Sequence, residues 1–239
     1  MTEILLLIFI PLSAGALAYV LGNLPSNIFK LILALSGAFV LAMCFMHLLP
    51  HVYHVISKEY VKGDLIVGAA VLSGFLIQIG LEWLTGGIEH GHSHVHEDQK
   101  FPIGLLIGLC LHALIEGLPL HDHGHEHNHL LVSVLVHKFP VALILVLVFK
   151  SYKLSHVKSW LYLLLFTLMA PLGMFLSQLF ENSMEDIGNV MMLITGSVIG
   201  VLLHISTTIL FEAGENHKYN ATKLAMIVLG FVIAYFTSM

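Results

Sequence analysis

Eight runs of about 20 mostly apolar residues fill most of this 239-residue chain. A helix needs a run of about that length to cross the hydrocarbon core of a bilayer. The chain is 57% hydrophobic and 10% charged, with a mean hydropathy of +0.90, whereas soluble domains carry about 25% charged residues. These features exclude a soluble protein. They predict membrane-crossing helices at 4–21, 28–49, 65–84, 101–120, 130–149, 160–180, 190–211 and 221–236.

The spans leave no room for a separate soluble unit, so we expect one all-α transmembrane domain over residues 1–239. Its orientation follows from the lysines, because the chain has no arginine and cytoplasmic loops carry an excess of basic residues. With the N-terminus outside, only Lys58 and Lys62 fall outside. Seven lysines fall inside: Lys30, Lys100, Lys150, Lys153, Lys158, Lys218 and Lys223. An even number of crossings then leaves both termini outside.

Histidine is strongly over-represented, with 17 residues in the chain, and imidazole is a common metal ligand. Two connecting segments alternate histidine with other residues, which is typical of metal-binding tracts. The loop at about 85–100 is expected in the cytosol, and the loop at 121–129 outside. The alternative is a low-complexity tract without function. The histidines expected to capture metal are His90, His92, His94, His96, His121, His123, His125, His127 and His129.

Ionisable residues inside a span are costly, about 2.5–3.5 kcal/mol each at the helix centre, and often mark function. His112 and Glu116 are four residues apart, which stacks them on one helical face. They lie about 12 and 6 Å below the outer end of their span, and His137 in the next span lies roughly 10 Å below its own outer end. The three side chains therefore share a layer. Two imidazoles and a carboxylate suit Zn²⁺ or a similar ion with open coordination positions. A buried hydrogen-bonded cluster that only locks helices together is the alternative.

Other polar residues mark the path that an ion would follow. The second span contains His47 and His51, and the seventh contains His204 and Glu212. The second, fourth, fifth and seventh spans are therefore expected to form the interior, and the uniformly apolar others to face lipid. Pro140 frees the carbonyl of the residue four positions earlier, and in a membrane such a group must be satisfied by another donor or line a cavity.

The sequence His112-Ala-Leu-Ile-Glu-Gly-Leu-Pro-Leu, followed in the next span by His137-Lys-Phe-Pro-Val-Ala-Leu, resembles the ZIP (Zrt-, Irt-like protein) family of divalent metal transporters. The segment His47-Leu-Leu-Pro-His is similar to the family's His-Leu-Leu-Pro-Glu, and a histidine-rich loop after the third span is a family trait. The resemblance implies an eight-helix bundle. It also implies a metal site between the fourth and fifth helices and delivery of the ion to the cytosol.

The sequence departs from the family pattern at positions that would bind a second ion. Ala113 stands where the family has asparagine or serine, Val141 where it has glutamate after the proline, and Ala170 where it often has glutamate before Pro-Leu-Gly. Lys138, at a position where family members carry aspartate or lysine, is expected to pair with Glu116. We therefore interpret the site as mononuclear, with His112, Glu116 and His137 as its core.

The predicted function is transport of a divalent metal ion into the cytosol by alternating access. Zn²⁺ is the first choice, and Fe²⁺, Mn²⁺ and Cd²⁺ remain open. We expect an integral protein of the cell (inner) membrane, with no prosthetic group and no nucleic-acid partner; a homodimer is left open. No phosphate-binding glycine loop and no His-Glu-x-x-His string occur, so an enzyme is not expected. The alternatives are a metal exporter of the cation-diffusion type and a haem-binding redox protein using His112 and His137 as axial ligands.

Overall fold

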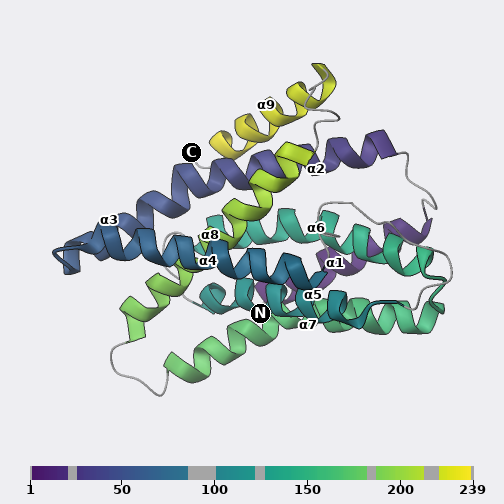
Figure 1. Ribbon diagram of the computed structural model, residues 1–239, viewed down its shortest axis with the longest axis horizontal. Coiled ribbons are helices and arrows are strands. Elements are labelled where there is room, and N and C mark those ends of the chain that lie inside the picture. The colour runs from purple at the N-terminus through teal and green to yellow at the C-terminus, as the bar shows by residue number, and fades with distance from the viewer. Residues whose placement is uncertain are drawn as a thin grey trace.

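The computed structural model describes residues 2–20, 26–85, 101–121, 127–181, 187–212 and 221–237, and within these ranges all regular structure is helical (Figure 1). The predicted capture residues His90, His92, His94, His96, His123 and His125 lie outside the described residues. The α-helices are α1 (Thr2–Val20), α2 (Ser26–Met43), α3 (Leu49–Glu59), α4 (Gly63–Thr85), α5 (Ile103–Gly117), α6 (His127–Ser151), α7 (His156–Glu181), α8 (Ile187–Glu212) and α9 (Ala221–Phe236).

Seven helical segments are long and apolar enough to cross a membrane, and α9, at 16 residues, is a shorter apolar helix. The prediction of a polytopic helical bundle is therefore confirmed. The predicted spans agree with the observed helices, except that the second is longer than expected. It continues through a π-helical segment, Cys44–Leu48, into α3 and forms an apolar stretch of 30 residues, Lys30–Glu59. Single π-helical turns often occur at functional sites, and this one contains His47.

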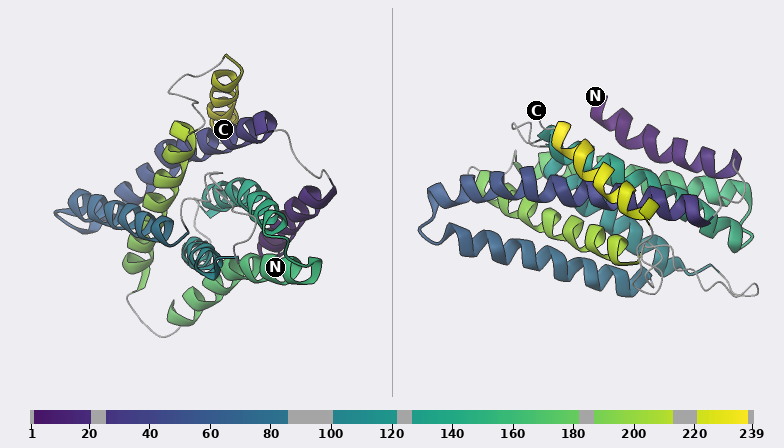
Figure 2. Two further views of the ribbon diagram at one scale, coloured as in Figure 1. Left: turned by 45° about the vertical axis from the view of Figure 1, so that its right-hand side comes forward. Right: turned by 90° about the horizontal axis from the view of Figure 1, so that it is seen from above.

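Helices α5 and α6 lie at the centre of the bundle (Figure 2). Helix α7 contacts α1, α5 and α6, and α1 also packs on α6, so these four helices form a first helix group. Helices α2, α3, α4, α8 and α9 form a second group. The two groups meet where α2 contacts α6 and where α4 contacts α5. Both central helices thus belong to the first group and lie against the second.

Among the seven long spans, burial follows the expected division between interior and outer helices. The apolar window of α6 is 78% buried and that of α4 only 22%. The second, fourth and seventh spans also bury more than half of their windows, whereas the first and sixth bury less. Close packing at Gly200 on α8 supports this interior. A side chain there would collide with the backbone of α4 at Val71, so the glycine lets α8 and α4 approach closely.

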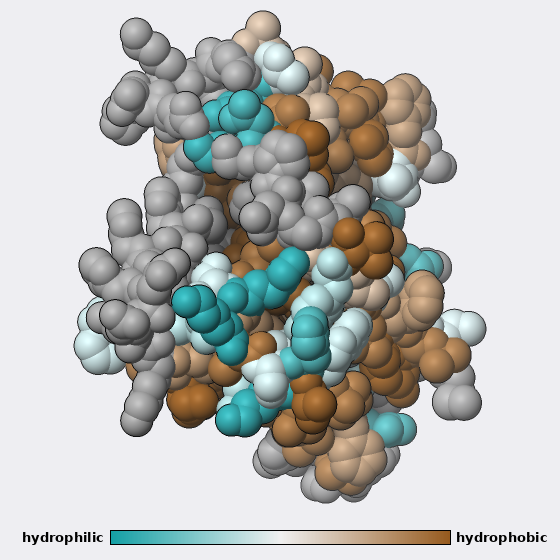
Figure 3. Space-filling view, turned by 90° about the vertical axis from the view of Figure 1, so that its right-hand side faces the viewer, coloured by the Kyte–Doolittle hydropathy of each residue, from teal (hydrophilic) through white to brown (hydrophobic). Residues whose placement is uncertain are grey.

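One end of the molecule is polar and its flanks are apolar. Hydrophilic side chains gather on the end at which α1 ends and α2 begins, and hydrophobic side chains surround them (Figure 3). The same end carries the turn between α6 and α7, with Lys150, Lys153 and Lys158. Lys58 and Lys62 lie at the other end, on the turn between α3 and α4. This distribution agrees with the lysine asymmetry from which the orientation was predicted.

Candidate metal centre

Helix α5 brings His112 and Glu116 into direct contact. Four residues span slightly more than one helical turn, so the two side chains lie on one face. His112 Nε2 is 3.1 Å from Glu116 Oε1. The two side chains are 1% and 0% exposed, so the protein surrounds this pair completely.

Helix α6 adds a second imidazole to this pair. The rings of His112 and His137 are 5.7 Å apart at centroid and nearly perpendicular, at 81°. One ligand atom from each of His112, Glu116 and His137 lies within 4.8 Å of the others, and all three residues are buried. Ligands in a tetrahedral Zn²⁺ shell, with bonds of about 2.0–2.2 Å, are about 3.4 Å apart. Small side-chain rotations would therefore close these three atoms around one ion.

Lys138 places a positive charge beside the carboxylate. Its Nζ donates to Glu116 Oε2 over 2.8 Å, and the lysine is 1% exposed. The ammonium also lies 5.1 Å from the centre of the Phe166 ring on α7, within the range of a cation–π contact. The pairing expected from the sequence is therefore present, and it engages the carboxylate oxygen that does not face His112.

A residue that the sequence analysis did not single out completes this arrangement. Gln78 on α4 is fully buried, and its Oε1 lies 3.0 Å from His112 Nδ1. A carboxamide oxygen only accepts hydrogen bonds, so Nδ1 of the ring is the donor. The amide within this mostly apolar span is the signal by which the sequence could have identified it. The interpretation of the third span as uniformly apolar was therefore wrong at this position.

A second polar pair lies between α4 and α8. His204 Nε2 is 3.4 Å from Glu82 Oε2, and the His204 ring packs edge-on against Phe75 at 4.7 Å. Glu82 follows Gln78 by one helical turn, about 6 Å along α4. Among the predicted path residues, His204 is thus joined by a carboxylate that the sequence analysis missed. The side chain of Glu212 lies outside the described residues.

The other predicted path residues lie nearer the opposite end of the bundle. The rings of His47 and His129 stack at 4.5 Å with an interplanar angle of 16°. His129 lies in the first turn of α6 and belongs to the predicted external tract, so the stack joins this tract to the π-helical segment. His51 is partly buried on α3. The side chains of His121 and His127 are not among those described.

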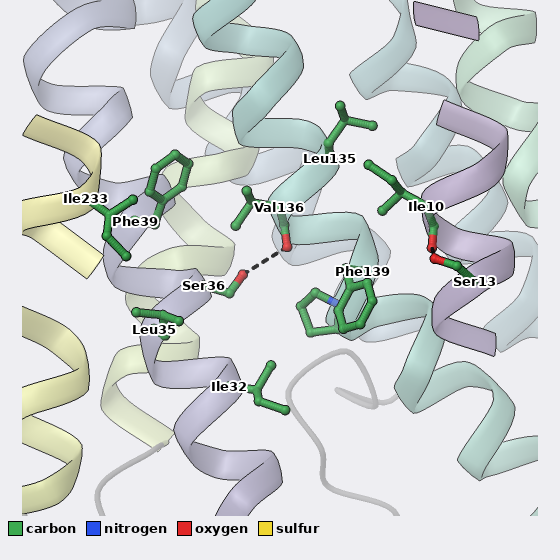
Figure 4. Close-up of a pocket in the computed structure, with 11 residues that line it drawn as sticks. Ile10, Ser13, Ile32, Leu35, Ser36, Phe39, Leu135, Val136, Phe139 and Ile233 are labelled. Carbon is green, nitrogen blue, oxygen red and sulfur yellow. Dashed lines mark hydrogen bonds between the residues drawn. The ribbon is translucent and has the colours of Figure 1, made fainter. Parts of the chain in front are cut away.

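Helix α6 continues through Pro140, and a neighbouring helix satisfies the carbonyl that the proline frees. Ser36 Oγ on α2 donates to Val136 O over 3.3 Å (Figure 4). This bond borders an apolar pocket of about 540 Å³ between α1 and α6 of the first helix group and α2 and α9 of the second. Phe139, Leu135 and Ile233 line the pocket. The sequence predicted that the freed carbonyl would either accept from another donor or line a cavity. The Val136 carbonyl accepts from Ser36, and Val136 also lines the pocket.

The fourth span ends with a change of helix type just after Glu116. Leu118–His121 form a 3₁₀ turn around Pro119, and the Leu118 N–H bonds to Ile115 O. Pro119 has no N–H to donate to that carbonyl, which is thus satisfied locally. Gly117 faces α7 so closely that any side chain would collide with the Ala170 backbone. This contact holds the end of α5, and with it Glu116, against α7.

Fold and site together define a polytopic helical membrane protein with two imidazoles and a carboxylate gathered in its interior. A family model described as ZIP Zinc transporter matches residues 88–238, and the chain belongs to this family. The ZIP family is a family of transporters and not of enzymes. The curated relative "Protein zntD" of Dictyostelium discoideum is 25% identical over 165 residues, which cover 62% of this chain. The aligned region is 24% of that protein, so the chain spans about a quarter of the length of this relative.

Proposed function

We propose that the protein transports a divalent transition-metal ion, Zn²⁺ by preference, into the cytosol through a site formed by His112, Glu116 and His137. The observation that carries this proposal is their convergence, buried, within 4.8 Å of one another. Membership of the ZIP family supports transport as the activity. It also favours this function over cation-diffusion export and haem binding. Fe²⁺, Mn²⁺ and Cd²⁺ are alternative cargoes, because each accepts nitrogen and oxygen ligands.

The geometry around His112 suits a cation site. Because His112 Nδ1 donates to Gln78, a neutral ring turns the lone pair of Nε2 towards Glu116 Oε1, 3.1 Å away. Two acceptor atoms at that distance repel each other, so this arrangement is stable when a cation, either a ring proton or a metal ion, lies between them.

We propose one ion in the site. Ala113, Val141 and Ala170 offer no side-chain ligand, and all three are buried. The ammonium of Lys138 engages the second oxygen of Glu116 and supplies positive charge there. Two imidazoles and one carboxylate oxygen leave at least one position of a tetrahedral shell open. Transport sites need such an incomplete shell, because a closed structural shell holds its ion.

The polar pairs on either side of the site are the proposed path. The stacked rings of His47 and His129 are at the end of the bundle that carries the external tract. Glu82 and His204 lie one helical turn beyond Gln78 in the opposite direction, on the side assigned to the cytosol. His51 and Glu212 remain candidates for the same path. In the proposed mechanism, α5 and α6 rearrange against the second helix group and expose the site to each side in turn.

The test is competitive uptake of Zn²⁺, Fe²⁺, Mn²⁺ and Cd²⁺ into proteoliposomes. His112→Ala and Glu116→Ala are expected to lower Zn²⁺ uptake at least about 10-fold, because each removes one of three proposed ligands. The control is His54→Ala, which removes an exposed imidazole from α3 and should leave uptake unchanged. If neither His112→Ala nor Glu116→Ala changes uptake of any of the four ions, the proposed site is wrong.

A further inference from the structure

Gln78 is buried without an obvious structural reason. It lies on α4, the least buried of the long spans, yet it is 0% exposed. A primary amide taken out of water or into lipid costs free energy unless it is hydrogen bonded. Its Oε1 meets Nδ1 of His112 at 3.0 Å. The amide in this place thus contacts a ligand of the proposed site directly.

The bond determines which nitrogen of His112 can bind an ion. Because Gln78 Oε1 accepts from Nδ1, that nitrogen carries a hydrogen, and in the neutral ring Nε2 carries the lone pair. Nε2 is the nitrogen beside Glu116. Metal-bound histidines commonly donate their other ring N–H to an acceptor, which fixes the orientation of the ring and makes the ligand more basic. The Gln78–His112 geometry is of this kind.

The bond also joins the two helix groups at the proposed site. Gln78 belongs to α4 of the second group, and His112 belongs to α5 of the first. A movement of α5 against α4 would therefore change the support of one ligand directly. His137 and Lys138, by contrast, lie on α6 of the same group as α5.

Resting on the proposed function, we infer that Gln78 is a positioning residue, which holds His112 with Nε2 directed at the transported ion. It does not contact the ion itself. Loss of the acceptor leaves the imidazole free to rotate or to place its hydrogen on Nε2, and either change removes a ligand from the site. The affinity of the site for the metal should therefore fall. The helices that move during transport, and their prolines, are unchanged.

The experiment measures the KM and maximal rate of Zn²⁺ uptake in proteoliposomes. Gln78→Leu should raise KM about 10- to 100-fold, the usual cost of losing the partner of a metal-binding histidine, with a much smaller change in maximal rate. Gln78→Glu keeps an acceptor for Nδ1 and should keep KM near that of the unaltered protein. Gln78→Met has nearly the length of glutamine and repeats the test if Gln78→Leu does not fold.

Ser177→Ala is the matched control, because it also removes a buried hydrogen bond between helices. Ser177 Oγ bonds Met191 Sδ at 3.3 Å, outside the proposed site. It should leave KM unchanged. The inference is overturned if Gln78→Leu or Gln78→Met leaves KM unchanged, or if Gln78→Glu raises it as much as they do. His112→Ala, run in parallel, separates the two proposals: if it lowers uptake while Gln78→Leu does not, only the role of Gln78 fails.

Discussion

At the scale of single residues, the carboxylate of Glu116 has two different neighbours. Its Oε1 faces Nε2 of His112, and its Oε2 accepts from the ammonium of Lys138. Both charged groups are buried, and a buried charge is tolerated only when it is paired and hydrogen bonded. Lys138 therefore gives the buried carboxylate a partner of opposite charge, next to the position proposed for the divalent ion.

Lys138→Met should destabilise the metal-free protein. Removing one partner of a buried ion pair leaves the other charge uncompensated, at a cost of about 3–5 kcal/mol. Saturating Zn²⁺ should restore much of the lost thermal stability, because the ion replaces the missing positive charge. The measurement is the melting temperature in detergent with and without Zn²⁺. The double variant Lys138→Met/Glu116→Gln, which has no unpaired charge, should be more stable than Lys138→Met alone. A single variant as stable as the unaltered protein would contradict this account.

The sequence was sufficient to predict the three clustered residues but not their surroundings. His112 and Glu116 lie on one helix, where a spacing of four residues sets their relation, and depth in the membrane brought His137 to the same layer. Gln78 and Glu82 come from α4, and no helical period relates positions on different helices. Which face of α4 meets α5 depends on packing, and the sequence alone does not determine it.

At the scale of elements, α6 depends on its neighbour α2 for an intact backbone. Pro140 prevents a hydrogen bond within the helix, and Ser36 donates one to Val136 O from outside. The prediction that the freed carbonyl needs a partner or a cavity follows from the proline alone. The identity of the donor does not, because Ser36 is 100 residues away in the chain. The π-helical segment at Cys44–Leu48 was not predicted either. The pattern of apolar residues in a span does not show whether a turn contains one residue more than an α-helical turn.

Ser36→Ala should lower thermal stability more than Ser13→Ala does. Both serines line the same apolar pocket, but Ser13 bonds Ile10 O of its own helix at 2.7 Å, whereas Ser36 joins two helices. Polar bonds between membrane helices contribute about 0.6 kcal/mol on average and up to about 1.7 kcal/mol. The measurement is unfolding of the two purified variants side by side. Equal stabilities would show that the Val136 carbonyl does not depend on the serine.

At the scale of the whole molecule, the proposed site lies where the two helix groups meet. The Gln78–His112 bond and the Ser36–Val136 bond both cross this junction, one on each side of the central helices. The number of spans and the division between interior and lipid-facing helices could be predicted from hydropathy and polar residues. The grouping of helices could not, because it depends on contacts between distant segments.

Uptake by the intact protein should weaken as the external pH falls from about 7.5 to about 5.5, across the range in which imidazole ordinarily titrates. Histidine and carboxylate ligands bind a metal only when deprotonated, so protons compete with the ion at the site and at the external tract. The measurement is initial Zn²⁺ flux into proteoliposomes with constant internal pH. His54→Ala, which alters an imidazole outside the site, should show the same profile. A flux that is constant over this range would argue against imidazole ligands.

The Glu116–Lys138 pair has a consequence for the energetics of transport across a polarised membrane. With neutral imidazoles, the empty site carries one negative and one positive charge and is electrically neutral as a whole. In the proposed mechanism, the charge transferred in each cycle is then that of the ion alone. Moving one elementary charge across 100 mV changes its free energy by about 2.3 kcal/mol. An interior-negative voltage therefore favours inward movement of the ion in the loaded site, and it does not oppose the return of the neutral, empty site.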